Sequence, residues 1–109
     1  MSMQAITTAE DLQPLRSHPA LLVLYGGAHC GVCQAIRPRL EALMAEHFAA
    51  ITLAYVDCAD APALCAQEGV FSLPVLRFYV HDQLALEYAR SFGLHEVAAQ
   101  MQRVLALAG

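Results

Sequence analysis

The sequence contains no lysine, and its six cationic side chains are all arginines. Without a side-chain amine the chain cannot form a Schiff base, and it lacks the lysine with which a P-loop holds phosphate. The arginines are scattered along 109 residues and the formal net charge is −4, so no basic stripe could follow a nucleic-acid backbone. We therefore expect no nucleic-acid partner.

Long apolar runs are also missing, although hydrophobic residues make up 58% of the chain. The longest clean run near the N-terminus, residues 20–25, is far too short to span a bilayer. The N-terminal segment contains Glu10 and Asp11 and has neither the basic nor the apolar part of a signal peptide. We expect one domain over residues 1–109, a monomer without a membrane partner, and a cytoplasmic location.

Four cysteines are present, and two of them, Cys30 and Cys33, form a C-x-x-C motif. In a chain without a secretory signal this spacing indicates a redox pair first and a metal site second. A metal site would need Cys58 and Cys65 or His29 to complete it. Structural zinc usually takes its ligands in close pairs, and six residues separate Cys58 from Cys65. We therefore expect no metal and no cofactor.

Apolar periodicity and turn residues predict alternating helices and strands. A capping box at residues 7–10 predicts a first helix from about Thr8 to Ser17. Asp60 is expected to cap a short helix that Gly69 closes. The remaining predicted elements are strands at 21–25, 51–57, 75–80 and 84–90, helices at 30–47, 61–68 and 94–108, and a further short strand as an option at 3–6. Strand–helix–strand followed by a hairpin and a terminal helix gives a mixed sheet between helix layers.

The C-x-x-C motif falls at the start of the second predicted helix, after the Gly26-Gly27 break. Unpaired backbone N–H groups and the positive end of the helix dipole favour a thiolate on Cys30. Cys33 follows one turn later on the same side of the helix and deeper in it. That geometry suits two-step exchange, in which Cys30 attacks a disulfide and Cys33 resolves the mixed disulfide.

From about Ala20 to Ala108 the sequence resembles the thioredoxin family. The matching features are the apolar strand at 21–25, the motif at 30–33, Pro38, Val56-Asp57 and the segment 69–75. The resemblance implies a thioredoxin fold of the α/β class, with a central mixed β-sheet flanked by helices on both faces. It also implies a cis-proline at Pro74 facing the dithiol, and a substrate segment that docks on the Leu73 backbone. Protein or small-molecule disulfides would be the substrates, and a reductase would donate electrons.

The second half also resembles the catalytic domains of protein disulfide isomerases, through Val56-Asp57-Cys58, Cys65 and residues 69–74. In that group the second cysteine pair is commonly a structural disulfide. In a reducing cytosol the alternative is two small buried hydrophobic residues. The sequence leaves both open.

Several positions depart from the thioredoxin pattern. His29 and Val32 stand where the family usually has Trp and Pro, and Leu24 and Leu53 replace a buried acid and its lysine partner. Losing both partners avoids an unpaired buried charge but removes the group that takes the proton from the resolving cysteine. We therefore expect slow resolution near neutral pH.

The residues beside the cysteines would modulate the centre. His29 stabilises the Cys30 thiolate when protonated, or shuttles a proton when neutral, or is an exposed loop residue without a role. No basic residue lies between the cysteines at Gly31 and Val32, which argues against a powerful oxidant and favours a specialised disulfide reductase. The alternative is a binding or chaperone-like module that docks partners at the Leu73-Pro74 surface.

Overall fold

The structure is a computed structural model that describes residues 3–108, so the outermost residues of the predicted 1–109 domain lie outside it. Each expected element is present, and the optional first strand forms as well. In chain order the elements are β1 (Gln4–Ala5), α1 (Ala9–Arg16), β2 (Ala20–Gly26), α2 (Gly31–His47), β3 (Thr52–Asp57), α3 (Pro62–Gln67), β4 (Val75–Val80), β5 (Gln83–Ala89) and α4 (Leu94–Ala108).

The five strands form one mixed sheet in the order β1-β3-β2-β4-β5. The β1, β3 and β2 strands run parallel, whereas β4 is antiparallel to both β2 and β5. β2 therefore lies at the centre, and its residues 21–26 are fully or almost fully buried. A strand covered on both faces is apolar throughout, which explains the uninterrupted run Leu21 to Tyr25.

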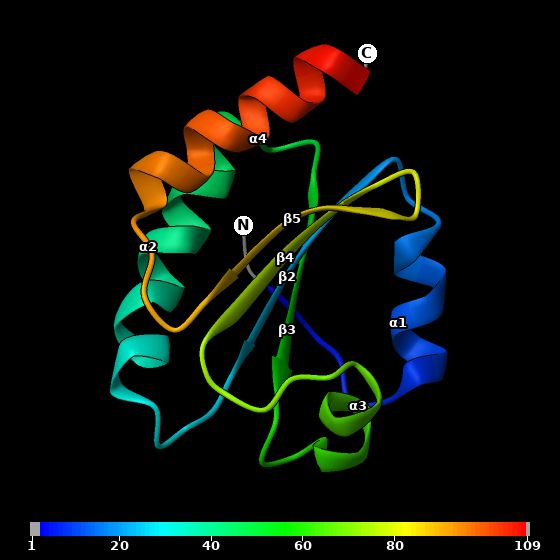
Figure 1. Cartoon of the computed structure of the whole chain (residues 1–109), viewed down its shortest axis with the longest axis vertical. Helices are drawn as coiled ribbons and strands as arrows, with labels where there is room; N and C mark the ends of the chain where they lie inside the picture. The colour runs from blue at the N-terminus through cyan, green and yellow to red at the C-terminus, as the bar shows by residue number, and fades with distance from the viewer. Residues whose placement is uncertain (1–2, 109) are drawn as a thin grey trace.

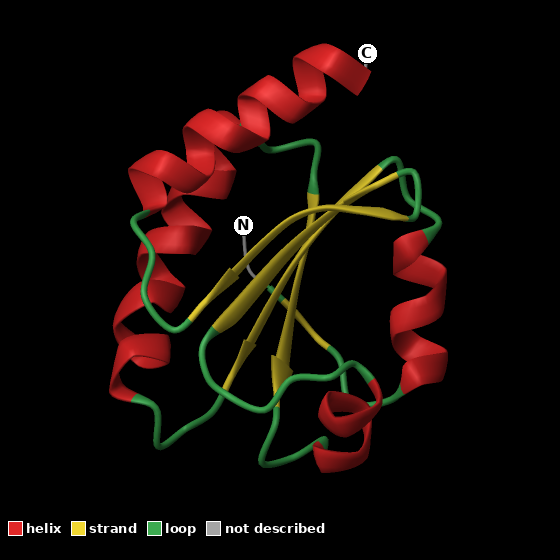
Figure 2. Ribbon diagram, viewed as in Figure 1, coloured by secondary structure: helices red, strands yellow, loops and turns green. Residues whose placement is uncertain are grey.

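Helices cover both faces of the sheet (Figures 1 and 2). α2 and α4 pack on one face through residues such as Ile36, Leu40 and Met101, which join a cluster with the β2 residues Leu22 and Leu24. α1 and α3 pack on the opposite face through a second cluster. The central mixed sheet with helices on both faces confirms the predicted fold class.

Two helix starts differ from the sequence prediction. The N-cap of α1 is Thr8, whose hydroxyl accepts a hydrogen bond from the Asp11 N–H at 3.1 Å, so the capping interaction lies one residue later than predicted. Asp60 does not cap α3. The helix begins at Pro62, one residue later than predicted, so Ala61 is the N-cap, without a side-chain hydrogen bond, and Asp60 lies before the capping position. Asp57 instead accepts from the Ala59 N–H in this turn.

The β4–β5 connection is a two-residue turn in which His81 and Asp82 both have positive φ, 49° and 64°. Two left-handed residues match the twist of a tight hairpin, and Asp is tolerated in that conformation. Within residues 3–108 no helix is long and apolar enough to cross a bilayer.

Candidate active site

The dithiol lies where the central strand passes into α2. β2 ends at Gly26, the loop turns through Gly27, and Cys30 is the N-cap of α2. The Cys30 N–H donates to the Gly27 carbonyl at 3.1 Å, and the Gln34 side-chain amide donates to the same oxygen at 3.1 Å. Both ends of this short loop are therefore fixed, which holds Cys30 at the positive end of the helix.

Cys30 and Cys33 form a disulfide, with Cα atoms 5.2 Å apart. The two sulfurs are in different environments, because Cys30 is partly exposed and Cys33 is fully buried. The Cys30 sulfur also accepts a hydrogen bond from the Cys33 N–H at 3.2 Å. A donor at a helix N-terminus stabilises negative charge on the sulfur it faces, so the accessible cysteine is the one equipped to be a thiolate nucleophile.

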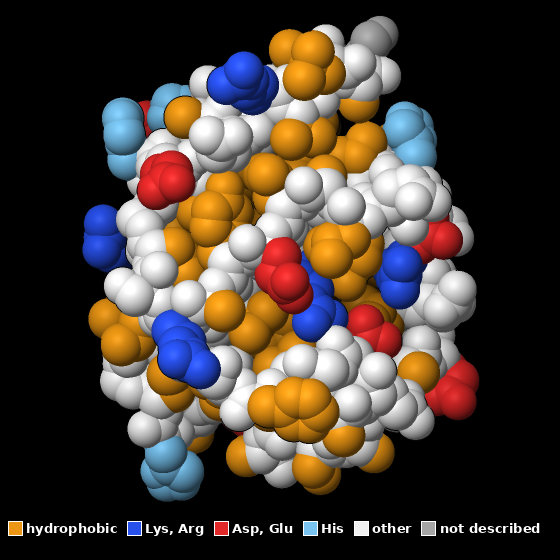
Figure 3. All heavy atoms as spheres, in the orientation of Figure 1, with side chains coloured by type: hydrophobic (Ala, Val, Ile, Leu, Met, Phe, Trp, Pro, Cys, Tyr) orange, Lys and Arg blue, Asp and Glu red, His pale blue; other side chains and the backbone are white. Residues whose placement is uncertain are grey.

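The loop before β4 faces the dithiol. The Leu73–Pro74 peptide bond is cis, and a Cβ atom on Gly27 would lie 3.4 Å from the Leu73 side chain. Leu73 and Cys30 line one shallow cavity of about 290 Å³ together with Gly27, Ala28, His29 and Ala59. In Figure 3 hydrophobic side chains gather at the lower edge of the molecule around α3, and the dithiol loop lies to their left. An apolar, partly open surface next to the reactive sulfur can receive an extended segment.

The three residues around the dithiol that sequence analysis singled out are all exposed. His29 lies in the wall of the cavity beside Cys30, whereas Gly31 and Val32 form the first turn of α2. The Val32 side chain is 55% exposed, which is unusual for a large apolar residue. The two cysteines are thus separated by a turn that presents no charge to a partner.

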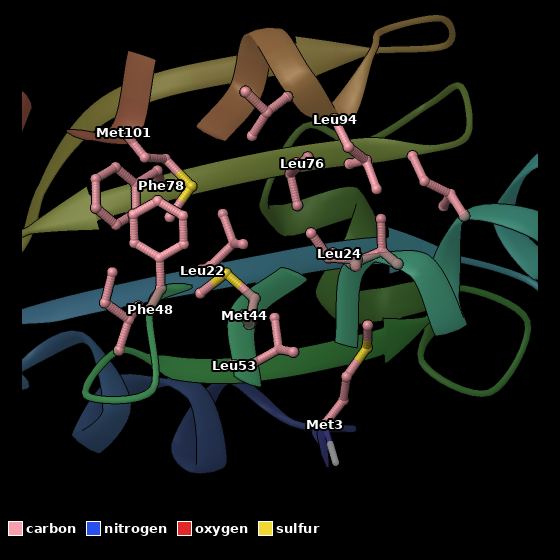
Figure 4. Packing of buried hydrophobic residues seen from close by; sticks show 14 of the residues in the cluster. Met3, Leu22, Leu24, Met44, Phe48, Leu53, Leu76, Phe78, Leu94 and Met101 are labelled. Atoms are coloured by element: carbon pink, nitrogen blue, oxygen red, sulfur yellow. The ribbon is translucent and has the colours of Figure 1, made fainter. Parts of the chain in front are cut away.

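Leu24 and Leu53, which replace the buried acid and lysine of the family, lie in the core below α2. Leu24 is 0% and Leu53 is 2% exposed, and both pack in the cluster that includes Met44 and Leu22 (Figure 4). An ionised side chain at either position would lose its hydration without gaining a charged partner. The paired loss of acid and lysine therefore gives a continuous apolar core.

The second cysteine pair is also joined. Cys58, directly after β3, forms a disulfide with Cys65 in α3, with Cα atoms 5.7 Å apart. Cys65 is 3% exposed and belongs to the cluster on the α1–α3 face. Of the two possibilities left open by the sequence, the structure has the disulfide. Among residues 3–108 no group of three His, Cys, Asp or Glu side chains could hold a metal ion.

Two residues near the site were missed by sequence analysis. A Cβ atom on Gly26 would lie 3.1 Å from both Cys33 Cβ and the Tyr55 hydroxyl, so Tyr55 on β3 lies close to the buried cysteine. Arg90 follows β5 with φ of 69°, and its backbone N–H donates to the Pro74 carbonyl at 2.7 Å. Tyr55 lies in a strand of mostly apolar residues, so the sequence pattern does not distinguish its hydroxyl from the core. Nothing in the sequence places Arg90 beside Pro74.

Comparison with known proteins agrees with this geometry. The thioredoxin family model matches residues 4–103. Homo sapiens protein disulfide-isomerase A2 is 40% identical over 68 residues, which are 60% of this chain and 13% of that protein. Streptomyces clavuligerus thioredoxin is 37% identical over 65 residues, 60% of each chain. The chain thus spans about an eighth of the length of the disulfide isomerase that it matches.

Solved thioredoxins have the same fold. The Fasciola hepatica thioredoxin superposes with a TM-score of 0.81 at 22% identity, covering 92% of this chain and 98% of that one. A mutant thioredoxin from Halobacterium salinarum gives a TM-score of 0.78 at 22% identity, covering 93% and 87%. The family model covers most of the chain, so the protein belongs to the thioredoxin family, and its joined C-x-x-C pair lies at Cys30 and Cys33.

Proposed function

We propose that this protein is a specialised protein-disulfide reductase. Cys30 attacks a substrate disulfide, and the substrate thiolate that leaves takes up a proton. Cys33 then attacks Cys30, which releases the second substrate thiol and forms the Cys30–Cys33 bond. A reductase returns the pair to the dithiol. The observation that carries the proposal is the contrast between a partly exposed Cys30 at a helix N-terminus and a fully buried Cys33.

The substrate would dock as an extended segment against Leu73, which is partly buried and lines the cavity, while the cis-proline Pro74 lies buried behind it. Support comes from the cavity that Leu73 shares with Cys30 and from the exposed apolar side chains nearby in the sequence. Phe71, two residues before Leu73, is 84% exposed. Such a surface suits disulfides flanked by apolar residues in partly unfolded proteins, or small-molecule disulfides that fit a cavity of about 290 Å³.

The direction of exchange is tested by the reduction potential. No basic side chain lies between the cysteines to stabilise the dithiol form, so we expect a potential at or below the glutathione range of about −220 to −260 mV. The chain has no tryptophan to report on its redox state. The measurement is therefore equilibration in glutathione buffers, read by mass spectrometry of alkylated Cys30–Cys33 peptides. A potential near about −120 mV, that of a strong oxidant, would overturn the reductase assignment.

A binding or chaperone-like module is the second candidate, and the exposed Val32 and Phe71 side chains favour it. In that case partners would dock on the Leu73-Pro74 surface without exchange. Replacing both cysteines of the pair separates the two functions. Cys30→Ser/Cys33→Ser would lose partner binding in a reductase and would retain it in a docking module.

We further propose that the protein works as a monomer in the cytoplasm, and the Cys58–Cys65 pair provides a test of the location. Cytosolic glutathione and thioredoxin keep most thiols reduced. Thiol trapping in intact cells should therefore find this pair largely reduced. A fully oxidised pair in cells would indicate an oxidising compartment instead.

A further inference from the structure

The buried hydroxyl of Tyr55 lies on the same face of the sheet as Leu24, the position where the family has its acid. Tyr55 on β3 pairs in register with Leu24 on β2, and both side chains belong to the cluster beneath α2. Gly26, two residues after Leu24, faces the same side. A Cβ atom at Gly26 would contact Cys33 Cβ and the Tyr55 hydroxyl at 3.1 Å each, so these two groups lie within twice that distance of each other.

The Tyr55 hydroxyl has no hydrogen-bond partner in this structure, although Tyr55 is only 5% exposed. A buried donor without an acceptor is costly and therefore uncommon in proteins. In the structure Cys33 is bonded to Cys30, and a disulfide sulfur is a weak acceptor. Reduction replaces that sulfur with a thiol or thiolate, and a thiolate is a charged acceptor.

We propose that the Tyr55 hydroxyl donates a hydrogen bond to the Cys33 sulfur once the disulfide is reduced, and thereby assists the resolving step in place of the missing acid. The proposal rests on the exchange activity proposed above. Cys33 loses its proton to water, the hydrogen bond stabilises the resulting thiolate, and this thiolate attacks the sulfur of Cys30. The Cys30–Cys33 bond forms, the bond between Cys30 and substrate breaks, and the departing substrate thiolate takes a proton from water.

The charges around Tyr55 keep its hydroxyl a donor. The Arg37 guanidinium of α2 lies 3.9 Å from the centroid of the Tyr55 ring, and Asp57 follows on the same strand. Burial raises the pKa of Tyr55 above its ordinary 10.0, Asp57 raises it further, and Arg37 and Gln34 lower it. The neighbouring residue of β2, Leu24, contributes no charge, and His29 is the ionisable side chain on the outer side of Cys30. The phenol therefore stays protonated at neutral pH while Arg37 favours a nearby anion.

Tyr55→Phe is the direct test, because it removes one buried oxygen that has no partner. Cys33 would be titrated by NMR of its Cβ carbon in the reduced full chain carrying Cys30→Ser. We expect Tyr55→Phe to raise the Cys33 pKa by about one pH unit, a tenfold loss of thiolate below that pKa. In a chain that retains Cys30, Tyr55→Phe should slow the resolution of a mixed disulfide by about the same factor, while thermal stability is unchanged or higher.

Tyr25→Phe is the matched control. Its hydroxyl is also buried without a partner, but Tyr25 belongs to the cluster on the opposite face of the sheet. It should leave the Cys33 titration unchanged. An unmoved Cys33 pKa in Tyr55→Phe, or an equal shift in Tyr25→Phe, would overturn the inference. A protein that fails to exchange but still shows the Tyr55-dependent titration would refute the proposed function and leave only the hydrogen bond from Tyr55 to Cys33 standing.

Discussion

At the scale of single residues, Leu24 is the feature that most separates this centre from its family. It is fully buried beneath α2 in an apolar cluster, and its register partner on β3 is Tyr55. A leucine cannot accept the proton that the resolving cysteine loses. We therefore expect turnover near neutral pH to be limited by the fraction of Cys33 that is already thiolate.

Leu24→Asp should therefore change the pH profile of turnover. A carboxyl at this buried position can accept the proton, and we expect resolution at pH 7 to speed up by about tenfold or more. The same substitution buries a charge without a partner and should lower the free energy of unfolding by about 3 kcal/mol or more. Stopped-flow resolution rates across pH 5–9 and urea unfolding measure the two effects.

Leu24→Asn is the control for that experiment, because the asparagine side chain has the shape of aspartate but does not titrate. It should be destabilised without a gain in rate. An unchanged pH profile in Leu24→Asp would show that the missing acid does not limit turnover.

His29 is the other residue whose role can be decided by one substitution. Its side chain is exposed, and it lines the cavity next to Cys30. Exposed charges are screened by water and salt, so His29→Ala should move the Cys30 pKa by less than about half a pH unit. The rate of Cys30 alkylation against pH gives this value. A rise of a full unit would assign His29 to stabilisation of the thiolate.

At the scale of elements, the first turn of α2 sets the geometry of the centre. Val32 is the second residue of this helix, and its side chain is 55% exposed. Proline is tolerated in a first turn, since the N–H it lacks has no partner within the helix. The preceding Gly31 has no Cβ to clash with the proline ring.

Val32→Pro should therefore stabilise the protein by about 0.4–1 kcal/mol, because it restricts the unfolded chain. Thermal or urea unfolding of the oxidised protein measures the change. Val32→Ala removes the same exposed apolar surface without the restriction and should be nearly neutral. A clear loss of stability in Val32→Pro would mean that the turn does not have the helical geometry described.

At the scale of the whole molecule, we expect stability to depend on pH in alkali, because Tyr25 and Tyr55 are buried and Tyr88 is partly buried. Burial raises the pKa of Tyr25, Tyr55 and Tyr88 above 10.0. For an acid whose folded pKa is raised, the unfolded chain loses its proton first, so the stabilisation is present below about pH 10 and is lost as pH rises further. The free energy of unfolding should thus fall steeply above pH 10.

Urea unfolding between pH 8 and 11 measures this slope. Tyr25→Phe should flatten it most, since Tyr25 has the largest upward shift of the three. A stability that stays constant to pH 11 would contradict the burial of these hydroxyls.

Much of the architecture follows from local patterns in the sequence. The apolar run Leu21 to Tyr25 predicted a doubly covered strand, and the spacing of Cys30 and Cys33 predicted a dithiol at a helix start. The predicted cap at Asp60 was wrong because the helix begins one residue later, at Pro62, which leaves Asp60 outside the N-cap position. The proximity of Tyr55 to Cys33 could not be predicted from the sequence. It depends on the register between β2 and β3 and on the absence of a side chain at Gly26, which lies between the two residues.

The central claim is that Cys30 attacks and Cys33 resolves, and trapping tests it most directly. Cys33→Ala, reduced and mixed with cell extract, should accumulate discrete mixed disulfides on Cys30 that dithiothreitol releases. The buried partner cannot do the same, so Cys30→Ala should trap nothing. Adducts of equal yield on both variants, or partners recovered only without a covalent bond, would contradict the account.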